Sequence, residues 1–295
     1  MSSNHGTSNH ATPPVREPKV VWNNVRTQTI SVGGTDFAYR TYGPDRGVPV
    51  VFLHHLTANL DNWDPRVVDG IAAHHRVIAF DNRGVGASGG TTPDTIEAMA
   101  ADAIAFIDAL GLKKVDLLGF SMGGFIAQVI VALRPGLVGK IILAGTGPAG
   151  GAGIDKVTRV SYTDSIKAVL TGKDPKQNLF FTRTDNGKAR SREFIARLKE
   201  RTENRDDAVS VTVFRTQLRA IHSWARQTPA DLGRITHPVL VVNGDDDRMV
   251  PTSNSHDLAR RLPDATLRIY PDAGHGGLFQ EHHQFVATAL EFLAA

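Results

Sequence analysis

Short apolar runs rich in β-branched residues alternate with segments of helical periodicity between residues 27 and 146. Four of the runs are apolar almost throughout, as expected for strands buried on both faces of a parallel sheet. They are VPVVFLHHL (48–56), HRVIAFD (75–81), KKVDLLGF (113–120) and GKIILAG (139–145). Two earlier runs, TQTISV and DFAYRTYG, predict an opening antiparallel pair. The alternation predicts an α/β protein with a largely parallel sheet covered by helices.

The alternation is interrupted between about residues 147 and 235, where a glycine-rich stretch leads into helical patterns without a strand. It resumes with the strands HPVLVVNG (237–244) and TLRIYP (266–271), and a helix over about 278–293 closes the chain. We therefore predict a core domain formed by residues 20–146 and 236–295 and an inserted helical cap subdomain, 147–235. Residues 1–19 are polar and rich in Ser, Asn and Pro, which predicts a disordered tail without a catalytic role.

The composition disfavours several classes of protein. Lys and Arg exceed Asp and Glu by 33 to 30, and the most basic stretch, 183–205, is interleaved with acidic residues, so we expect no nucleic-acid partner. The absence of cysteine excludes disulfides, thiolate metal sites and a cysteine nucleophile. The sequence contains neither a signal-peptide pattern nor an apolar run of membrane-spanning length, which predicts a soluble cytoplasmic protein with no membrane partner.

Two serines stand in a G-x-S-x-G pattern, Ser88 in GASGG and Ser121 in GFSMG. Ser121 directly follows the predicted strand 113–120 and directly precedes the helical pattern MGGFIAQVIVAL, so a strand, a sharp turn and a helix meet there. Small residues must flank such a turn, and Gly119 and Gly123 provide them. Ser88 is followed by GGTTP, which opposes an immediate helix. We therefore predict that Ser121 is a nucleophile and that Ser88 is a loop serine.

A serine hydroxyl is a weak nucleophile and needs a histidine base and an acid that orients this histidine. Two late strands end in candidates, since HPVLVVNG continues into DDDRMVP and TLRIYP continues into DAGHGG. Because ligand sites of open α/β sheets form at the carboxyl ends of the strands, we expect these residues beside Ser121. We predict His275, which has glycine on both sides, as the base, and one of Asp245, Asp246 and Asp247 as the acid.

One glycine-rich stretch resembles a dinucleotide-binding fingerprint. GTGPAG (145–150) follows a predicted strand, as the glycine loop of a Rossmann fold does. Such a site also needs a helix that begins at the loop and an acidic residue near the end of the next strand. Here Gly151 and Gly153 weaken the start of a helix, and the segment that follows is helical rather than extended. The sequence therefore disfavours an oxidoreductase.

Three motifs resemble those of the α/β-hydrolase superfamily in order and spacing. GFSMGG resembles the nucleophile elbow, GDDDRMVP the acid turn and AGHGG the histidine loop. The resemblance covers about residues 27–295 and implies an α/β-hydrolase fold, with a mostly parallel eight-stranded sheet and a helical cap after the sixth strand. It implies Asp247 as the acid, with Asp246 as the alternative. DNRGVGAS (81–88) resembles a structural loop of the superfamily, so Ser88 has no catalytic role.

The resemblance also implies an oxyanion hole made of two backbone N–H groups. Met122, directly after the nucleophile, provides one of them. The other comes from the loop after the third strand, where LHHLT places His55 at a position that is usually glycine, and Leu56 then carries the donor. Histidine resists conformations that glycine accepts, so this substitution bears on the local backbone. The triad requires neither a metal nor an organic cofactor.

The implied activity is hydrolysis of carboxylic esters through an acyl-enzyme, with a small-molecule ester or lactone as substrate. The chain, FLHHLTANLDNWDPRVVDGIA (52–72) in particular, also resembles bacterial esterases carried with antibiotic-resistance genes, which implies opening of macrolide lactones. His55, His222 and Trp224 are candidates for the substrate pocket, and Trp224 has an alternative place in the core of the cap. Three alternatives stay open: a cofactor-free haloperoxidase or perhydrolase, a carbon-carbon bond hydrolase, and a noncatalytic small-molecule receptor.

Overall fold

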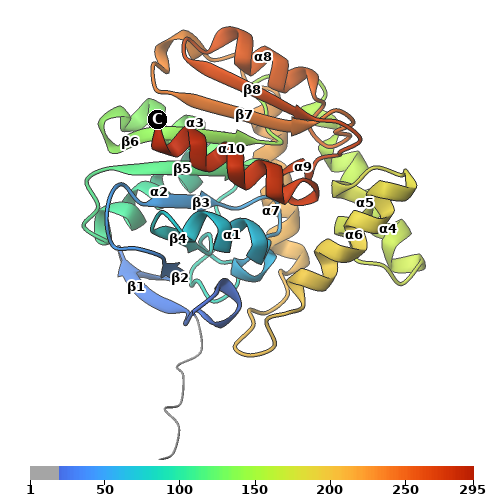
Figure 1. The fold of residues 1–295 in the computed structure, drawn as a ribbon, viewed down its shortest axis with the longest axis horizontal. Coiled ribbons are helices and arrows are strands. Elements are labelled where there is room, and N and C mark those ends of the chain that lie inside the picture. Colours follow the sequence, from blue (N-terminus) through green and yellow to red (C-terminus); the bar gives the residue numbers. More distant parts are fainter. Residues whose placement is uncertain (1–19) are drawn as a thin grey trace, which may run out of the picture.

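A mixed sheet of eight strands forms the centre of the computed structural model, which describes residues 20–295 (Figure 1). The strands are β1 (Gln28–Val32), β2 (Thr35–Tyr42), β3 (Val50–Leu53), β4 (Val77–Phe80), β5 (Val115–Phe120), β6 (Val138–Ala144), β7 (Val239–Gly244) and β8 (Ala265–Tyr270). Their order is β1-β2-β4-β3-β5-β6-β7-β8. β2 is antiparallel to β1 and β4, and all other neighbours are parallel. The predicted mostly parallel sheet and its opening antiparallel pair are confirmed.

Ten α-helices accompany the sheet in the described residues. They are α1 (Pro65–Ala72), α2 (Ile96–Ala109), α3 (Met122–Leu133), α4 (Val157–Leu170), α5 (Pro175–Phe180), α6 (Asp185–Leu198), α7 (Val211–Ala225), α8 (Ser253–Arg261), α9 (Gly277–Gln280) and α10 (His282–Ala294). The predicted closing helix is wrong in one respect, because it is divided at Glu281, which has φ −104° and ψ 38°. α9 packs against β7 whereas α10 packs against α1, so the chain changes direction between them. None of the described helices is both long and apolar enough to cross a lipid bilayer.

The two faces of the sheet bury separate apolar cores. Successive side chains of a strand point to opposite faces, so Val51 and Leu53 enter one core while Val50 and Phe52 enter the other. Helices α2, α3, α7 and α8 cover the first face, and α1, α6, α9 and α10 cover the second. Burial on both faces explains why the central strands are apolar throughout.

The residues between β6 and β7 form helices and no strand, from α4 to α7. α4, α5 and α6 lie together at one side of the sheet (Figure 1). α7 instead runs over the face that carries α2 and α3, where Trp224 stacks on Phe125 with ring centroids 5.4 Å apart. The helical part of the chain therefore has one portion beyond the strand ends and one portion packed into the core. The predicted tail, residues 1–19, lies outside the described residues.

Buried ion pairs attach β2, α6 and the segment after α6 to the loop after β3. Arg197 of α6 places its guanidinium 2.7 Å from the carboxylate of Asp64, which is fully buried and also caps α1 through the Arg66 N–H. Arg40 of β2 lies 2.7 Å from Asp61, and the side chain of Arg201 lies 3.5 Å from Asp61. Removing one partner of a buried pair leaves an uncompensated charge, so these contacts fix the position of α6 relative to the loop after β3.

Candidate active site

Ser121 occupies a strained turn between β5 and α3. Its φ is 55° and its ψ is −116°, a conformation that non-glycine residues rarely adopt. The turn is possible because neighbouring glycines leave room: a Cβ on Gly119 would lie 2.4 Å from the Gly123 carbonyl oxygen, and one on Gly124 would lie 2.5 Å from Thr146. Although Ser121 stands at the N-cap position, its hydroxyl makes no capping hydrogen bond. The hydroxyl is therefore free to act on a ligand at the carboxyl edge of the sheet.

Ser88 has a different environment. It is buried, and its Oγ accepts a hydrogen bond from the Ala38 N–H at 2.9 Å and donates one to the Asp81 carbonyl at 2.8 Å. The Asp81 carboxylate in turn accepts the N–H groups of Leu60 and Ala87. Ser88 therefore ties β2 to the loop after β4 and has no free hydroxyl to offer a substrate.

His275 and Asp247 form a buried pair at the same edge of the sheet. His275 Nδ1 lies 2.8 Å from Asp247 Oδ2, and both side chains are almost fully buried. Asp247 Oδ1 also accepts the N–H groups of Met249 and Val250 at 2.8 and 2.9 Å. These bonds fix the orientation of the carboxylate. The carboxylate then holds the proton of His275 on Nδ1 and leaves Nε2 as the basic nitrogen.

The other two aspartates of the acidic run serve the turn itself. Asp245 Oδ1 accepts the Ala273 N–H at 3.2 Å, and the Asp246 N–H donates to the Ala273 carbonyl at 3.0 Å. Both residues are exposed, whereas Asp247 is buried and pairs with His275. Among the three acids that the sequence left open, the geometry thus brings Asp247 to His275.

The loop after β3 approaches the turn at Ser121. β3 pairs with β5 so that Leu53 stands beside Gly119, and the residues after both strands are therefore neighbours. Within the described residues neither the Leu56 N–H nor the Met122 N–H donates a hydrogen bond. The residue of this loop with a left-handed backbone is Thr57, at φ 56°, rather than His55. The Thr57 N–H is held by the side-chain oxygen of Gln217 on α7 at 2.7 Å.

His55 is buried between aromatic rings. Its ring makes edge contacts with Phe120 and Phe180 at centroid distances of 5.2 and 5.0 Å. Burial lowers the pKa of His55 well below its ordinary value, and the positive charge of Lys176 lowers it further. His55 Nδ1 lies 2.8 Å from the Leu56 carbonyl oxygen, so the neutral ring carries its proton on Nδ1. The histidine in the usual glycine position thus braces the backbone at Leu56.

Ser121 and His275 line one cavity of about 560 Å³. This volume is within the range of roughly 300–1,000 Å³ that small-molecule sites occupy. The core domain contributes His55, Leu56, Thr57 and Met249 to its wall as well. Most of the other lining residues come from the helices after β6, among them Ser161, Ser165, Lys176, Leu179, Phe180, Val211 and Phe214. The surface of the cavity is mainly apolar, and its polar side chains are spread over both parts of the wall, from Ser121 and His275 to Ser165 and Lys176.

His222 and Trp224 do not line this cavity. Trp224 is buried against Phe125, which agrees with the alternative place in the core, and His222 lines a separate groove between α4 and α7. α7 is long enough to reach two places. Val211 and Phe214 in its first turns line the cavity, whereas its last turn, with Trp224, lies over α3. The lining residues of α5 were not among the predicted site residues, although the apolar run LFF (179–181) was an available signal.

The glycine-rich stretch after β6 packs against other loops. A Cβ on Gly145 would lie 2.9 Å from the His275 carbonyl oxygen, and one on Gly147 would lie 2.9 Å from Asn254. These glycines are explained by close packing against the histidine loop and against α8, which gives the dinucleotide hypothesis no support. Among residues 20–295, no three His, Asp or Glu side chains are grouped in a way that could hold a metal ion.

The sheet order, the helices on both faces and the turn at Ser121 define the class of α/β hydrolases. The sequence profile of the alpha/beta hydrolase fold matches residues 48–282, which is most of the chain. The chain belongs to this family and is an enzyme of the α/β-hydrolase type.

Three similar proteins illustrate the range of the family. The structure of an alpha/beta hydrolase fold protein from Chitinophaga pinensis is 39% identical, with a TM-score of 0.88, and covers 94% of this chain and 100% of its own. BpoC of Mycobacterium tuberculosis, provisionally named a non-heme bromoperoxidase, is 30% identical over 84% of this chain and 95% of its own length. Est816, described as an N-acyl homoserine lactone degrading enzyme, is 25% identical, with a TM-score of 0.71, over 90% of this chain and 100% of its own.

Proposed function

We propose that the protein is a serine hydrolase that cleaves carboxylic esters, lactones included, through a Ser121-His275-Asp247 triad. The observation that carries the proposal is the buried His275–Asp247 pair, 2.8 Å apart, at a cavity that Ser121 also lines. A histidine whose Nδ1 is held by a carboxylate has its Nε2 available as a base. A serine in a strained turn with an unbonded hydroxyl is the matching nucleophile.

The reaction begins when His275 Nε2 takes the proton of Ser121 Oγ as this oxygen attacks the ester carbonyl. The Met122 and Leu56 N–H groups donate hydrogen bonds to the negatively charged carbonyl oxygen, and each stabilises the transition state by about 3 kcal/mol. The imidazolium, held by Asp247, then protonates the leaving alcohol and an acyl-enzyme results. A water molecule, deprotonated by His275, hydrolyses the acyl-enzyme and restores Ser121. In a lactone the leaving alcohol stays attached to the acid, so the ring opens.

The substrate class follows from the cavity. Its wall is mainly apolar, so a ligand with an apolar acyl part fits it better than a highly charged one. The similarity to Est816, a lactone-degrading enzyme by its description, supports lactones as substrates. Macrolide lactones are the more specific prediction and rest on the resemblance of the sequence to macrolide esterases.

A fluorophosphonate probe, followed by an ester, lactone and macrolide panel read by mass spectrometry, tests the proposal. We expect the probe to label Ser121, and we expect substrates to gain the mass of one water. Hydrolysis of esters and simple lactones with every macrolide intact would remove the macrolide prediction and keep the hydrolase. If the probe does not label Ser121 and no substrate is turned over, the hydrolase proposal is contradicted and a noncatalytic receptor is favoured.

A second activity, perhydrolysis, is favoured by the 30% identity to BpoC. Hydrogen peroxide would replace water in the attack on the acyl-enzyme and release a peracid, which oxidises halide ions in solution. Assaying monochlorodimedone bromination in the presence of acetate, bromide and peroxide tests this activity. Bromination that disappears in Ser121→Ala would support it, and bromination that persists in the variant would contradict it.

A further inference from the structure

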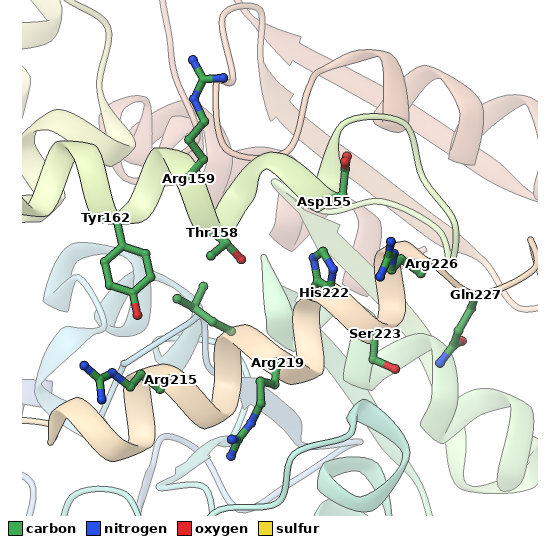
Figure 2. Close-up of a pocket in the computed structure, with 11 residues that line it drawn as sticks. Asp155, Thr158, Arg159, Tyr162, Arg215, Arg219, His222, Ser223, Arg226 and Gln227 are labelled. Atoms are coloured by element: carbon green, nitrogen blue, oxygen red, sulfur yellow. The ribbon is translucent and has the colours of Figure 1, made fainter.

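A second cavity, of about 870 Å³, lies between α4 and α7 (Figure 2). We call it the α4–α7 groove. Its inner wall is formed by Thr158 and Tyr162 of α4 and by Leu218 and His222 of α7. Figure 2 shows Thr158 and Tyr162 pointing from α4 toward α7, and His222 pointing from α7 toward α4. The groove thus offers apolar and aromatic surface together with three polar groups.

Four arginines surround the α4–α7 groove. They are Arg159 on α4, Arg215 and Arg219 on α7, and Arg226 directly after α7, and all four are exposed. Within the described residues none of them forms an ion pair with a carboxylate, and the acidic residue of the lining, Asp155, is unpaired as well. Many other arginines of the chain do pair with acids, as Arg197 does with Asp64.

The groove is lined by four arginines and one aspartate, so it has a local excess of positive charge in a chain whose formal net charge is +3. Like charges around one groove repel one another, and Figure 2 shows Arg159 and Arg219 extending to opposite sides of the helix pair. Each guanidinium presents a planar fork of N–H donors that matches the oxygens of a phosphate or carboxylate. An anion with several charges offsets the repulsion and accepts hydrogen bonds from arginines that have no carboxylate partner, although Arg219 donates one to the Thr216 hydroxyl.

We propose that the α4–α7 groove binds an organic anion that carries two or more negative charges and an apolar portion. The flexible arginine side chains of both helices turn inward to contact the anionic oxygens, and the apolar portion lies on Tyr162 and Leu218. The arginine forks bind the charged oxygens of an inorganic polyphosphate as well, and the aromatic and aliphatic surface adds contacts that an ion without an apolar portion does not make.

The groove shares two walls with the Ser121 cavity. α4 gives Ser161 and Ser165 to the cavity and Tyr162 to the groove, while α7 gives Phe214 to the cavity and Leu218 to the groove. Tyr162 and Phe214 touch, with ring centroids 5.2 Å apart and an interplanar angle of 67°. An anion that bridges the two helices therefore holds this ring pair and with it the wall of the cavity.

The anion has two conceivable sources, and this part of the inference rests on the proposed hydrolase function. It is either the charged end of an ester whose carbonyl reaches Ser121, or a separate effector. The two sources differ in kinetics. If the anion is part of the substrate, replacing the groove arginines raises KM at least tenfold for an ester with an anionic tail. If the anion is a separate effector, adding it in free form alters the KM of a neutral ester.

Calorimetric titration with inorganic tripolyphosphate tests binding without relying on hydrolysis. We expect one binding event on the full chain, which weakens at least tenfold between 20 and 200 mM NaCl and at least tenfold in Arg215→Gln/Arg219→Gln. Arg268→Gln is the matched control, because Arg268 on β8 also lacks a carboxylate partner but lies outside the groove. The control should bind as the unmodified protein does.

Absence of binding, or equal binding by the double variant and the unmodified protein, would overturn the proposal. The same titration on Ser121→Ala separates the two proposals. If this variant binds the anion while the unmodified protein hydrolyses no ester, the hydrolase proposal fails and the anion-binding proposal stands. Thermal unfolding of each variant checks that the exposed arginines were replaced without loss of the fold.

Discussion

Gly123 lies so close to the end of β3 that a Cβ atom on it would be 2.0 Å from the carbonyl oxygen of Leu53. This contact joins the first turn of α3 to the strand whose following loop contains Leu56. It explains how the Met122 and Leu56 N–H groups, on two segments far apart in the sequence, come to lie at the same edge of the sheet. The proposed oxyanion hole depends on this close approach.

Gly123→Ala should therefore damage both the fold and the catalysis. The methyl group cannot be accommodated without moving α3 or β3, which costs about 1–3 kcal/mol or more in the free energy of unfolding. A displacement of about 1 Å at the nucleophile should lower kcat/KM for esters about 100-fold. Urea unfolding and ester kinetics measure the two effects. The control is Gly136→Ala, since a Cβ at Gly136 meets no atom within 4 Å, and equal behaviour of the two variants would refute the argument.

Ser121→Ala and Ser88→Ala should separate catalysis from structure. Ser121→Ala removes the nucleophile, so ester turnover should fall about 10⁴-fold or more while the stability changes little. Ser88→Ala removes a buried hydroxyl that bonds Ala38 and Asp81, which should cost about 1–3 kcal/mol and leave kcat intact. Stopped assays and urea unfolding on both proteins measure this. A Ser88→Ala enzyme without activity at full stability would contradict the assignment.

Asp247→Asn should cripple the enzyme while Asp246→Asn should not. The asparagine cannot stabilise the imidazolium and permits the wrong tautomer of His275, so kcat should fall about 10⁴-fold. Asp246 is exposed and contacts the neighbouring loop through its backbone, so its side chain should be dispensable. Single-turnover measurements with a chromogenic ester distinguish the two. The reverse pattern would place the acid one residue earlier.

The sequence allowed the sheet and the turn at Ser121 to be predicted because both depend on local patterns. Strands buried on two faces are apolar throughout, and the six residues GFSMGG predict a sharp turn at a serine between a strand and a helix. The rule that parallel strands end at one edge placed His275 near the run of three aspartates, and the resemblance to the family then implied Asp247.

The cavity wall could not be predicted in the same way. Periodicity shows which face of α7 is apolar, but it does not show that Phe214 meets the cavity while Trp224, ten residues later, meets Phe125. The left-handed backbone at Thr57, supported by Gln217 from a distant helix, has no local signal either. Both features depend on how the helices after β6 are placed on the core.

Trp224→Ala should therefore affect stability rather than specificity. The change removes a buried ring stacked on Phe125 and should cost about 3–5 kcal/mol in the free energy of unfolding. The ratio of kcat/KM values for short and long acyl esters should stay the same. Phe214→Ala, on the same helix but at the cavity, should change that ratio. A specificity change in Trp224→Ala at full stability would restore the earlier pocket assignment.

The last prediction concerns the stability of the protein in acid. His54 is fully buried beside Trp63, and burial lowers its pKa to about 3 in the folded state, from about 6.5 in the unfolded chain. Between these pH values the unfolded state binds the proton and the folded state does not. Protonation of His54 therefore does not reduce the free energy of unfolding well above pH 6.5, and reduces it increasingly as the pH drops toward 3. His55, whose pKa is also lowered by burial, acts in the same direction.

His54 alone should thus reduce the free energy of unfolding by about 2 kcal/mol between pH 7.5 and pH 5.0. In His54→Phe, which keeps a ring against Trp63 but has no proton to bind, this pH-dependent loss should be smaller than in the unmodified protein by about the same 2 kcal/mol. Urea unfolding of both proteins at the two pH values measures the difference, and any pH-independent effect of the substitution cancels. Identical losses in the two proteins would mean that His54 accepts a proton in the folded state.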